Sequence, residues 1–154
     1  TELYVINVHF KEDFVLWRKR ESGGGLIGTY SSQSAALDHL AKEGLKAEDH
    51  EIIQTQSHLL LRKDPETGEL LKTPFLMDFA SSKLRVSREW NTQIGQLGGD
   101  RFSALWKLSS LQTQNRAAQK FYNLNAENQG WVTEEDYEYA KDVYSKLNLS
   151  PTDS

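Results

Sequence analysis

The sequence contains no cysteine. This absence excludes thiol catalysis, Cys-ligated zinc, iron–sulfur clusters and disulfide bonds, and it is typical of proteins from a reducing compartment. The opening residues Thr1, Glu2 and Leu3 provide neither the basic nor the apolar stretch of a signal peptide. No apolar run approaches the roughly 18 residues of a membrane span. We therefore expect a cytoplasmic protein without membrane association, whose 154 residues fold as one domain, 1–154.

A recognisable catalytic or metal-binding signature is also missing. The spacing of the four histidines matches neither H-x-x-x-H nor H-E-x-x-H. Residues 23–28, Gly-Gly-Gly-Leu-Ile-Gly, match the dinucleotide-binding string G-x-G-x-x-G. That motif needs an apolar strand running into the loop and a helix directly after it, and neither is present, so we favour an inter-strand loop. We expect a non-catalytic protein with no metal and no cofactor; an enzyme of unrecognised type is the alternative.

Apolar periodicity predicts six strands and three helices. The strands are expected at residues 3–10, 14–20, 52–61, 69–79, 102–111 and 121–126, and the helices at about residues 32–44, 82–95 and 133–147. A polar turn at 11–13 separates the first two strands, and Pro74 favours a sheet edge because it lacks an N–H. The resulting order, ββαββαββα, predicts an α+β fold with a mostly antiparallel sheet. A partly open, OB-like barrel is one arrangement of such strands.

Charge is distributed unevenly along the chain. Residues 81–120 carry seven basic and two acidic side chains, net +5, although the whole chain has a net charge of −4. The flanking segments 1–80 and 121–154 are acidic. Such segregation predicts a locally positive surface for an anionic partner. The alternative is that the basic and acidic segments neutralise each other in the fold.

Aromatic residues alternate with basic ones in several predicted strands. Proteins that bind single-stranded nucleic acid combine a positive groove for the phosphates with aromatic rings on which bases stack. The pattern therefore predicts a single-stranded nucleic-acid-binding module, with core packing as the alternative role of each ring. The candidate contact residues are Trp17, Arg18, Lys19, Arg20, Lys83, Arg85, Arg88, Arg101, Trp106, Lys107, Arg116, Lys120 and Tyr122.

Three stretches carry a resemblance to a known group of proteins. They are residues 78–91 (DFASSKLRVSREWN), residues 99–107 (GDRFSALWK), and the segment from residue 121 (FYN) to residue 137 (GWVTEEDY at its end). Over about residues 78–147 the chain resembles small uncharacterised proteins of tailed bacteriophages, some of the single-stranded-DNA-binding type. The resemblance implies a non-catalytic accessory protein of phage DNA replication or recombination, located in the host cytoplasm, with single-stranded DNA as its partner.

The last predicted helix offers an alternative function. Thr133 and Asp136 form a pair typical of a capping box, and acids fill the first turn. Tyr137, Tyr139 and Tyr144 lie among further acids, a composition that suits helix-in-groove docking. The alternative is therefore a protein-interaction module, such as a phage factor that binds or inhibits a host enzyme through this helix or a sheet edge. The sequence leaves a homodimer open.

Overall fold

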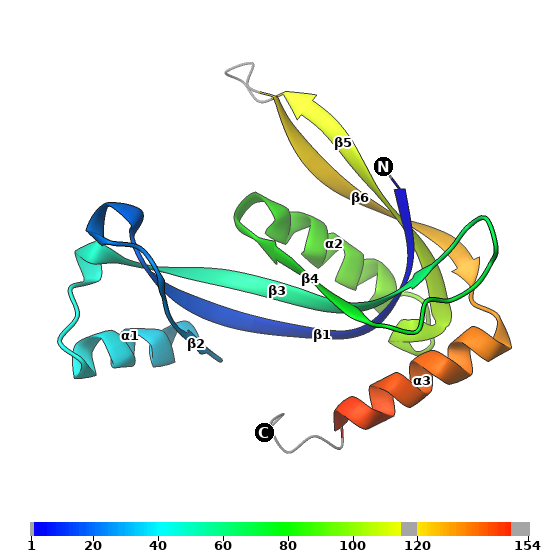
Figure 1. Cartoon of the computed structure of the whole chain (residues 1–154), viewed down its shortest axis with the longest axis horizontal. Coiled ribbons are helices and arrows are strands. Elements are labelled where there is room, and N and C mark those ends of the chain that lie inside the picture. Colours follow the sequence, from blue (N-terminus) through cyan, green and yellow to red (C-terminus); the bar gives the residue numbers. More distant parts are fainter. Residues whose placement is uncertain (1, 115–119, 149–154) are drawn as a thin grey trace. The chain divides into compact units, whose positions relative to one another are not determined.

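The structure, a computed structural model, describes the backbone of residues 2–114 and 120–148 and the side chains of residues 2–110 and 124–147. Its elements follow the predicted order ββαββαββα and confirm an α+β fold with a mostly antiparallel, open sheet (Figure 1). In chain order they are β1 (Glu2–Arg18), β2 (Leu26–Tyr30), α1 (Gln33–Lys42), β3 (His50–Lys63), β4 (Phe75–Ala80), α2 (Leu84–Gly95), β5 (Ala104–Gln114), β6 (Lys120–Trp131) and α3 (Glu134–Asn148).

The strands are hydrogen-bonded in the order β4-β3-β1-β5-β6, and β2 pairs with β1 outside this path. Pairing is antiparallel between β1 and β2, between β1 and β5, and between β5 and β6. β4 begins directly after Pro74 and is an end strand in this order, as the missing N–H of proline favours. The OB-like closure stays a prediction.

The described chain divides into two compact units. Unit 1 consists of residues 1–10, 58–77 and 85–154, and unit 2 consists of residues 11–57 and 78–84. Strands β1, β3 and β4 each run from one unit into the other. The predicted single domain stays a prediction.

The predicted turn at 11–13 is wrong, because β1 continues through it as one strand of 17 residues. Within unit 2, the Glu12 carboxylate accepts hydrogen bonds from Gln54 Nε2 at 2.6 Å and Gln56 Nε2 at 2.7 Å, both on β3. Lys11 and Asp13, two residues apart and so on one face of the strand, form an ion pair at 3.4 Å. The polar triplet therefore has partners in an extended conformation and does not need to turn.

Residues 26–28, predicted to belong to an inter-strand loop, instead form the start of strand β2. The predicted break is present at residues 23–25, where all three glycines have a positive φ that other residues rarely adopt. The chain then resumes an extended conformation and pairs with β1, with Gly28 opposite Leu16. A Cβ on Gly28 would lie 2.7 Å from the Tyr30 hydroxyl, so the glycine in this short strand makes room for a ring.

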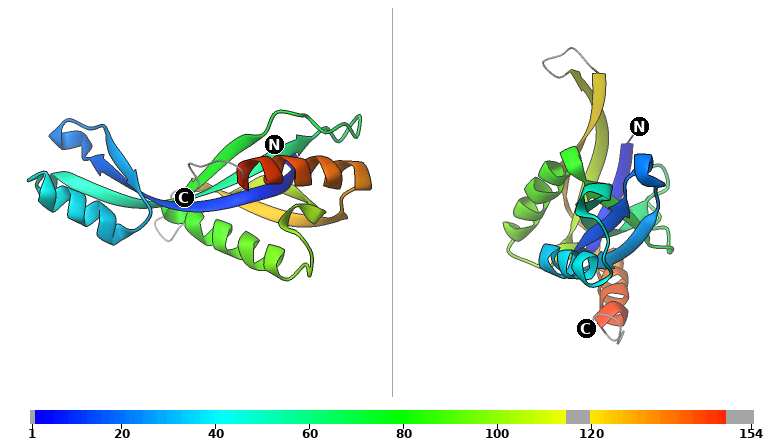
Figure 2. Two further views of the ribbon diagram at one scale, coloured as in Figure 1. Left: turned by 90° about the horizontal axis from the view of Figure 1, so that it is seen from below. Right: turned by 90° about the vertical axis from the view of Figure 1, so that its left-hand side faces the viewer.

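The sheet of unit 1 is covered on both faces. On one face, Ile6 and Val8 of β1 belong to a buried cluster with Ala140 of α3. On the other, Trp106 of β5 packs edge-on against Trp90 of α2, with ring centroids 6.1 Å apart. α2 and α3 accordingly flank the strands from opposite sides (Figure 2). Double coverage explains why residues 3–10 read as a nearly continuous apolar run instead of an alternating one.

Helix α2 buries one face, and α3 begins with the predicted cap. Trp90 and Ile94 are buried and Val86 is half-buried, and Ser87 joins the buried side of α2. At the start of α3, Thr133 Oγ1 accepts a hydrogen bond from the Asp136 backbone N–H at 3.2 Å, as a helix cap does.

Candidate functional site

The first group of predicted contact residues lies at the end of the β1–β2 hairpin in unit 2. Trp17 is 37% exposed and stands opposite Leu26, which is 58% exposed. Arg18 and Arg20 are exposed and Lys19 is half-buried. These five residues, which we call the hairpin tip, combine an accessible ring with three cations on one short connection.

Backbone hydrogen bonds fix the hairpin tip. The Arg18 N–H donates to the Gly25 carbonyl at 2.9 Å, and the Lys19 N–H donates to the Asp49 carbonyl at 2.8 Å. Ser22 Oγ donates to the Asp49 carboxylate at 3.1 Å. The tip is therefore a built turn that holds the Trp17 ring and its basic neighbours together. Lys83, also in unit 2, is exposed.

Two of the remaining basic candidates, Arg85 and Lys107, already lie beside carboxylates in unit 1. Arg85 and Arg88 are exposed on α2, where Arg85 pairs with Glu89 at 3.2 Å. Lys107 lies 3.9 Å from each of two carboxylates, those of Glu2 and Glu127. Arg116 falls outside the described residues, as do the side chains of Lys120 and Tyr122.

The stacking role predicted for Trp106 is wrong. Its side chain is fully buried, because the alternation of β5 directs it toward α2, where it packs against Trp90. No face of this ring is open to a base. The core alternative therefore holds for Trp106, whereas Trp17 keeps an accessible surface.

The tyrosines of α3 are occupied by contacts within unit 1. The rings of Tyr137 and Tyr144 lie 5.3 Å and 5.7 Å from that of Phe102. The Tyr139 hydroxyl donates to the Lys72 carbonyl at 2.8 Å, and the Lys72 ammonium lies 4.0 Å from the Tyr139 ring centre. A partner groove would have to replace these contacts, so the predicted docking face is not an open apolar stripe.

Arg101 differs from the other basic candidates because it turns inward. Its guanidinium donates to Asn7 Oδ1 at 3.1 Å and to Asn91 Oδ1 at 2.8 Å, and it lies 5.5 Å from the centre of the Phe10 ring. Burial lowers the pKa of Arg101 below its usual range. Among the described residues, no carboxylate forms an ion pair with it. This half-buried cation is thus held by two neutral amides and an aromatic ring.

A buried polar chain supports Arg101. Because the Asn7 amide oxygen accepts from Arg101, its amide nitrogen donates to His58 Nδ1 at 2.8 Å. The proton of the neutral imidazole is therefore on Nε2, which donates to Ser87 Oγ at 2.7 Å. The His58 ring also stacks on Trp90 at 4.9 Å. Burial, with a smaller contribution from the Arg101 charge, lowers the pKa of His58 to about 3. The imidazole is therefore neutral at physiological pH.

This Ser87–His58–Asn7 arrangement has the order of contacts of a catalytic triad, which spacing along the sequence did not show. All three side chains are fully buried, however, and a base with so low a pKa does not accept a proton from serine near pH 7. The arrangement therefore fits a structural role that orients Arg101. The absence of catalysis stays a prediction.

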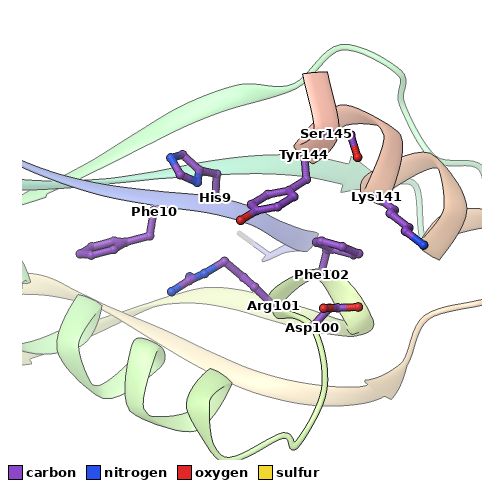
Figure 3. Close-up of a pocket in the computed structure, with 8 residues that line it drawn as sticks. All are labelled: His9, Phe10, Asp100, Arg101, Phe102, Lys141, Tyr144 and Ser145. Carbon is purple, nitrogen blue, oxygen red and sulfur yellow. The ribbon is translucent and has the colours of Figure 1, made fainter. Parts of the chain in front are cut away.

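A pocket of about 400 Å³ opens beside Arg101 (Figure 3). β1, the segment before β5 and α3 contribute its walls. The lining residues are His9, Phe10, Asp100, Arg101, Phe102, Lys141, Tyr144 and Ser145. The Asp100 carboxylate accepts a hydrogen bond from the Tyr137 hydroxyl at 2.5 Å, which raises the pKa of Tyr137. The pocket thus combines two basic side chains, one carboxylate that accepts a hydrogen bond from Tyr137, and several rings.

An exposed tryptophan that sequence reasoning missed lies at the end of β6. Trp131 is 67% exposed and borders a hollow of about 170 Å³ lined also by Leu97, Ala104, Asn128 and Gly130. β6 ends the strand order, so within the described part of the chain its outer edge pairs with no other strand. Only the contrast between an apolar ring and its polar neighbours 127–130 could have indicated it.

The part of the chain that the structure describes holds no group of three or more His, Asp or Glu side chains arranged for a metal ion. None of the helices in that part is long and apolar enough to cross a membrane.

Comparison with known proteins identifies the family. The model of the Pam3 phage gp34-like protein family matches residues 1–150 and so includes residues 1–50, which the resemblance over 78–147 left out. No curated protein and no solved structure matches the chain. Because the match spans nearly the whole sequence, the chain belongs to the Pam3 phage gp34-like family and is a phage protein.

Proposed function

We propose that this phage protein is a non-catalytic accessory protein that binds single-stranded DNA through the hairpin tip of unit 2, in the host cytoplasm. The observation that carries the proposal is the exposure of Trp17 beside exposed Arg18 and Arg20. An indole face contributes about 1–3 kcal/mol per stacked base, whichever base it meets, and adjacent guanidiniums bind the phosphates on either side.

The basic residues of unit 1 play a smaller part in this proposal than the sequence indicated. Arg85 already pairs with Glu89, and Lys107 lies between two carboxylates. Binding that rests on the hairpin tip alone engages about three phosphates, which gives a slope of roughly −2 in log K against log[salt] for a single strand. Engagement of α2 as well would steepen the slope.

Intrinsic fluorescence tests the proposal, because two of the four tryptophans are fully buried and only Trp17 and Trp131 are exposed. In Trp131→Phe, titration with oligo-dT should quench the emission of Trp17, and the quenching should weaken as salt is raised. Adding Trp17→Phe to the Trp131→Phe variant keeps a ring for stacking but removes the exposed fluorophore. DNA binding should then persist without quenching of the tryptophan emission. Trp17→Ala should weaken binding about tenfold, measured by filter retention. Unchanged affinity in Trp17→Ala would contradict the proposal.

A second candidate function rests on Trp131. A tryptophan 67% exposed at an open strand edge is typical of an anchor for a protein partner. In this alternative the phage protein binds a host or viral protein at β6. Trp131→Ala should then abolish capture of a defined host protein from nuclease-treated lysate, whereas Trp17→Ala should not. Sedimentation of both variants would show whether the partner is a second copy of this chain.

A further inference from the structure

We propose that the pocket beside Arg101 in unit 1 binds a free mononucleotide, with its phosphate on Arg101 and Lys141 and its base against the aromatic wall. This proposal does not depend on the hairpin tip, which belongs to unit 2. It concerns a site of small-molecule size, for which about 400 Å³ lies in the usual range.

The unpaired charge of Arg101 is the first reason. A half-buried cation without a carboxylate partner is costly to maintain, and charged groups in such environments cluster at functional sites. Two of the five guanidinium N–H groups donate to Asn7 and Asn91, and this fixes the plane of the group. The remaining N–H groups suit bidentate contact with phosphate oxygens.

The buried polar chain is the second reason. Asn7 donates to neutral His58 through its amide nitrogen and accepts from Arg101 through its amide oxygen. His58 is in turn fixed by Ser87 and by stacking on Trp90. The orientation of Arg101 is therefore set before any ligand arrives, which lowers the entropic cost of binding.

The lining of the pocket gives the third reason. His9 and Phe102 each pack against Tyr144, at 6.1 Å and 5.7 Å, and so form a continuous ring wall (Figure 3). Lys141 on α3 adds a second cation to the lining. Inorganic phosphate would make no contact with the aromatic wall, and an uncharged nucleoside would provide no negative charge for Arg101 and Lys141. A nucleotide provides both a base for the rings and a phosphate for the cations.

No carboxylate of the described residues forms an ion pair with either cation. The Asp100 carboxylate, which also lines the pocket, accepts a hydrogen bond from the Tyr137 hydroxyl, and Asp142 on α3 pairs with Lys146 at 3.0 Å. Lys141 is exposed and takes part in no ion pair among the described residues. Lys146 lies on the same helix, is exposed, and does not line the pocket, so it provides a matched control.

Calorimetric titration of the whole chain with dTMP, AMP, thymidine and inorganic phosphate tests the proposal. Both nucleotides should bind at least tenfold more tightly than thymidine or phosphate. Lys141→Ala should weaken nucleotide binding about tenfold, whereas Lys146→Ala should leave it unchanged. Arg101→Lys should weaken it further, because the planar fork is lost. If Arg101→Lys fails to fold, the two α3 variants still decide the outcome.

Three results would overturn the proposal: no binding of either nucleotide, phosphate binding as tightly as nucleotide, or equal losses in Lys141→Ala and Lys146→Ala. Failure of the DNA proposal is distinguishable from these. Trp17→Ala should retain nucleotide binding while oligo-dT binding falls, and Lys141→Ala should show the reverse.

Discussion

The hairpin tip of unit 2 and the Arg101 site of unit 1 use the same residue types in opposite ways. At the tip, Trp17, Arg18 and Arg20 are exposed on a turn fixed by backbone hydrogen bonds. At the second site, Arg101 is held by the amides of Asn7 and Asn91 beside Phe10, and elsewhere in unit 1 Trp106 is fully buried beside Lys107. In a strand, an aromatic residue next to a basic one is therefore exposed or buried depending on whether a helix covers the face to which the ring points.

The largest expected difference in unfolding free energy lies between substitutions of Trp106 and of Trp17. Trp106→Ala should lower the free energy of unfolding by about 3–5 kcal/mol, because it removes a fully buried ring and leaves a cavity. Trp17→Ala should lower it by less than about 1 kcal/mol, because its ring is partly in water. Urea denaturation followed by circular dichroism measures both. Similar losses in the two variants would remove the distinction between core and surface.

Lowering the pH should decrease the stability of unit 1, because His58 is buried in its neutral form. The folded pKa of His58, about 3, is below the unfolded value of 6.5, so the unfolded chain binds the extra proton between these pH values. Stability from His58 is complete above pH 6.5 and is lost as pH falls toward 3; at pH 5 the loss is about 2 kcal/mol. His58→Gln should flatten the fall in unfolding free energy between pH 7 and 5, whereas His39→Gln, in unit 2, should leave it steep. A slope insensitive to His58→Gln would show that this histidine is not buried neutral.

Ion pairs provide the next contrast. Lys63 and Asp136 pair at 2.7 Å with both side chains largely buried, whereas Arg85 and Glu89 pair at 3.2 Å in full solvent. Asp136→Asn should cost about 1–2 kcal/mol of unfolding free energy, because the opposite charge is lost while Lys63 stays half-buried. Glu89→Gln should cost less than about 0.5 kcal/mol. Thermal melts at low and high salt measure both losses, and salt should change only the second.

Substitutions at the hairpin tip should have the smallest effect on stability. They should instead change the salt dependence of DNA binding. Arg18→Ala with Arg20→Ala should alter the unfolding free energy by less than about 0.5 kcal/mol, since both side chains are exposed. If each binds one phosphate, the slope of log K against log[salt] should become shallower by roughly 1.4. Arg85→Ala with Arg88→Ala is the comparison in unit 1. A larger change of slope there would move the DNA surface to α2.

The sequence predicted the α+β fold class, the three helices and the cap of α3, because each depends on local periodicity or on neighbouring residues. The number of strands before α1 agrees with the prediction only because the strands expected at 3–10 and 14–20 are one strand, β1, and residues 26–30 form the second. The continuity of β1 was missed because Glu12 finds its partners on β3, some forty residues away. The link from Asn7 through His58 to Ser87 was missed for the same reason. The exposed edge at Trp131 was missed because strand order decides which strand is last.

Strand β1 has a consequence for how this family can vary in length. A turn at residues 11–13 would tolerate the gain or loss of a residue, but an uninterrupted strand does not, because one added residue sends every later side chain to the other face. Leu16 would then be turned out into water and the neighbouring polar groups turned in. Relatives should therefore conserve the number of residues between Val8 and Leu16 more strictly than their identities.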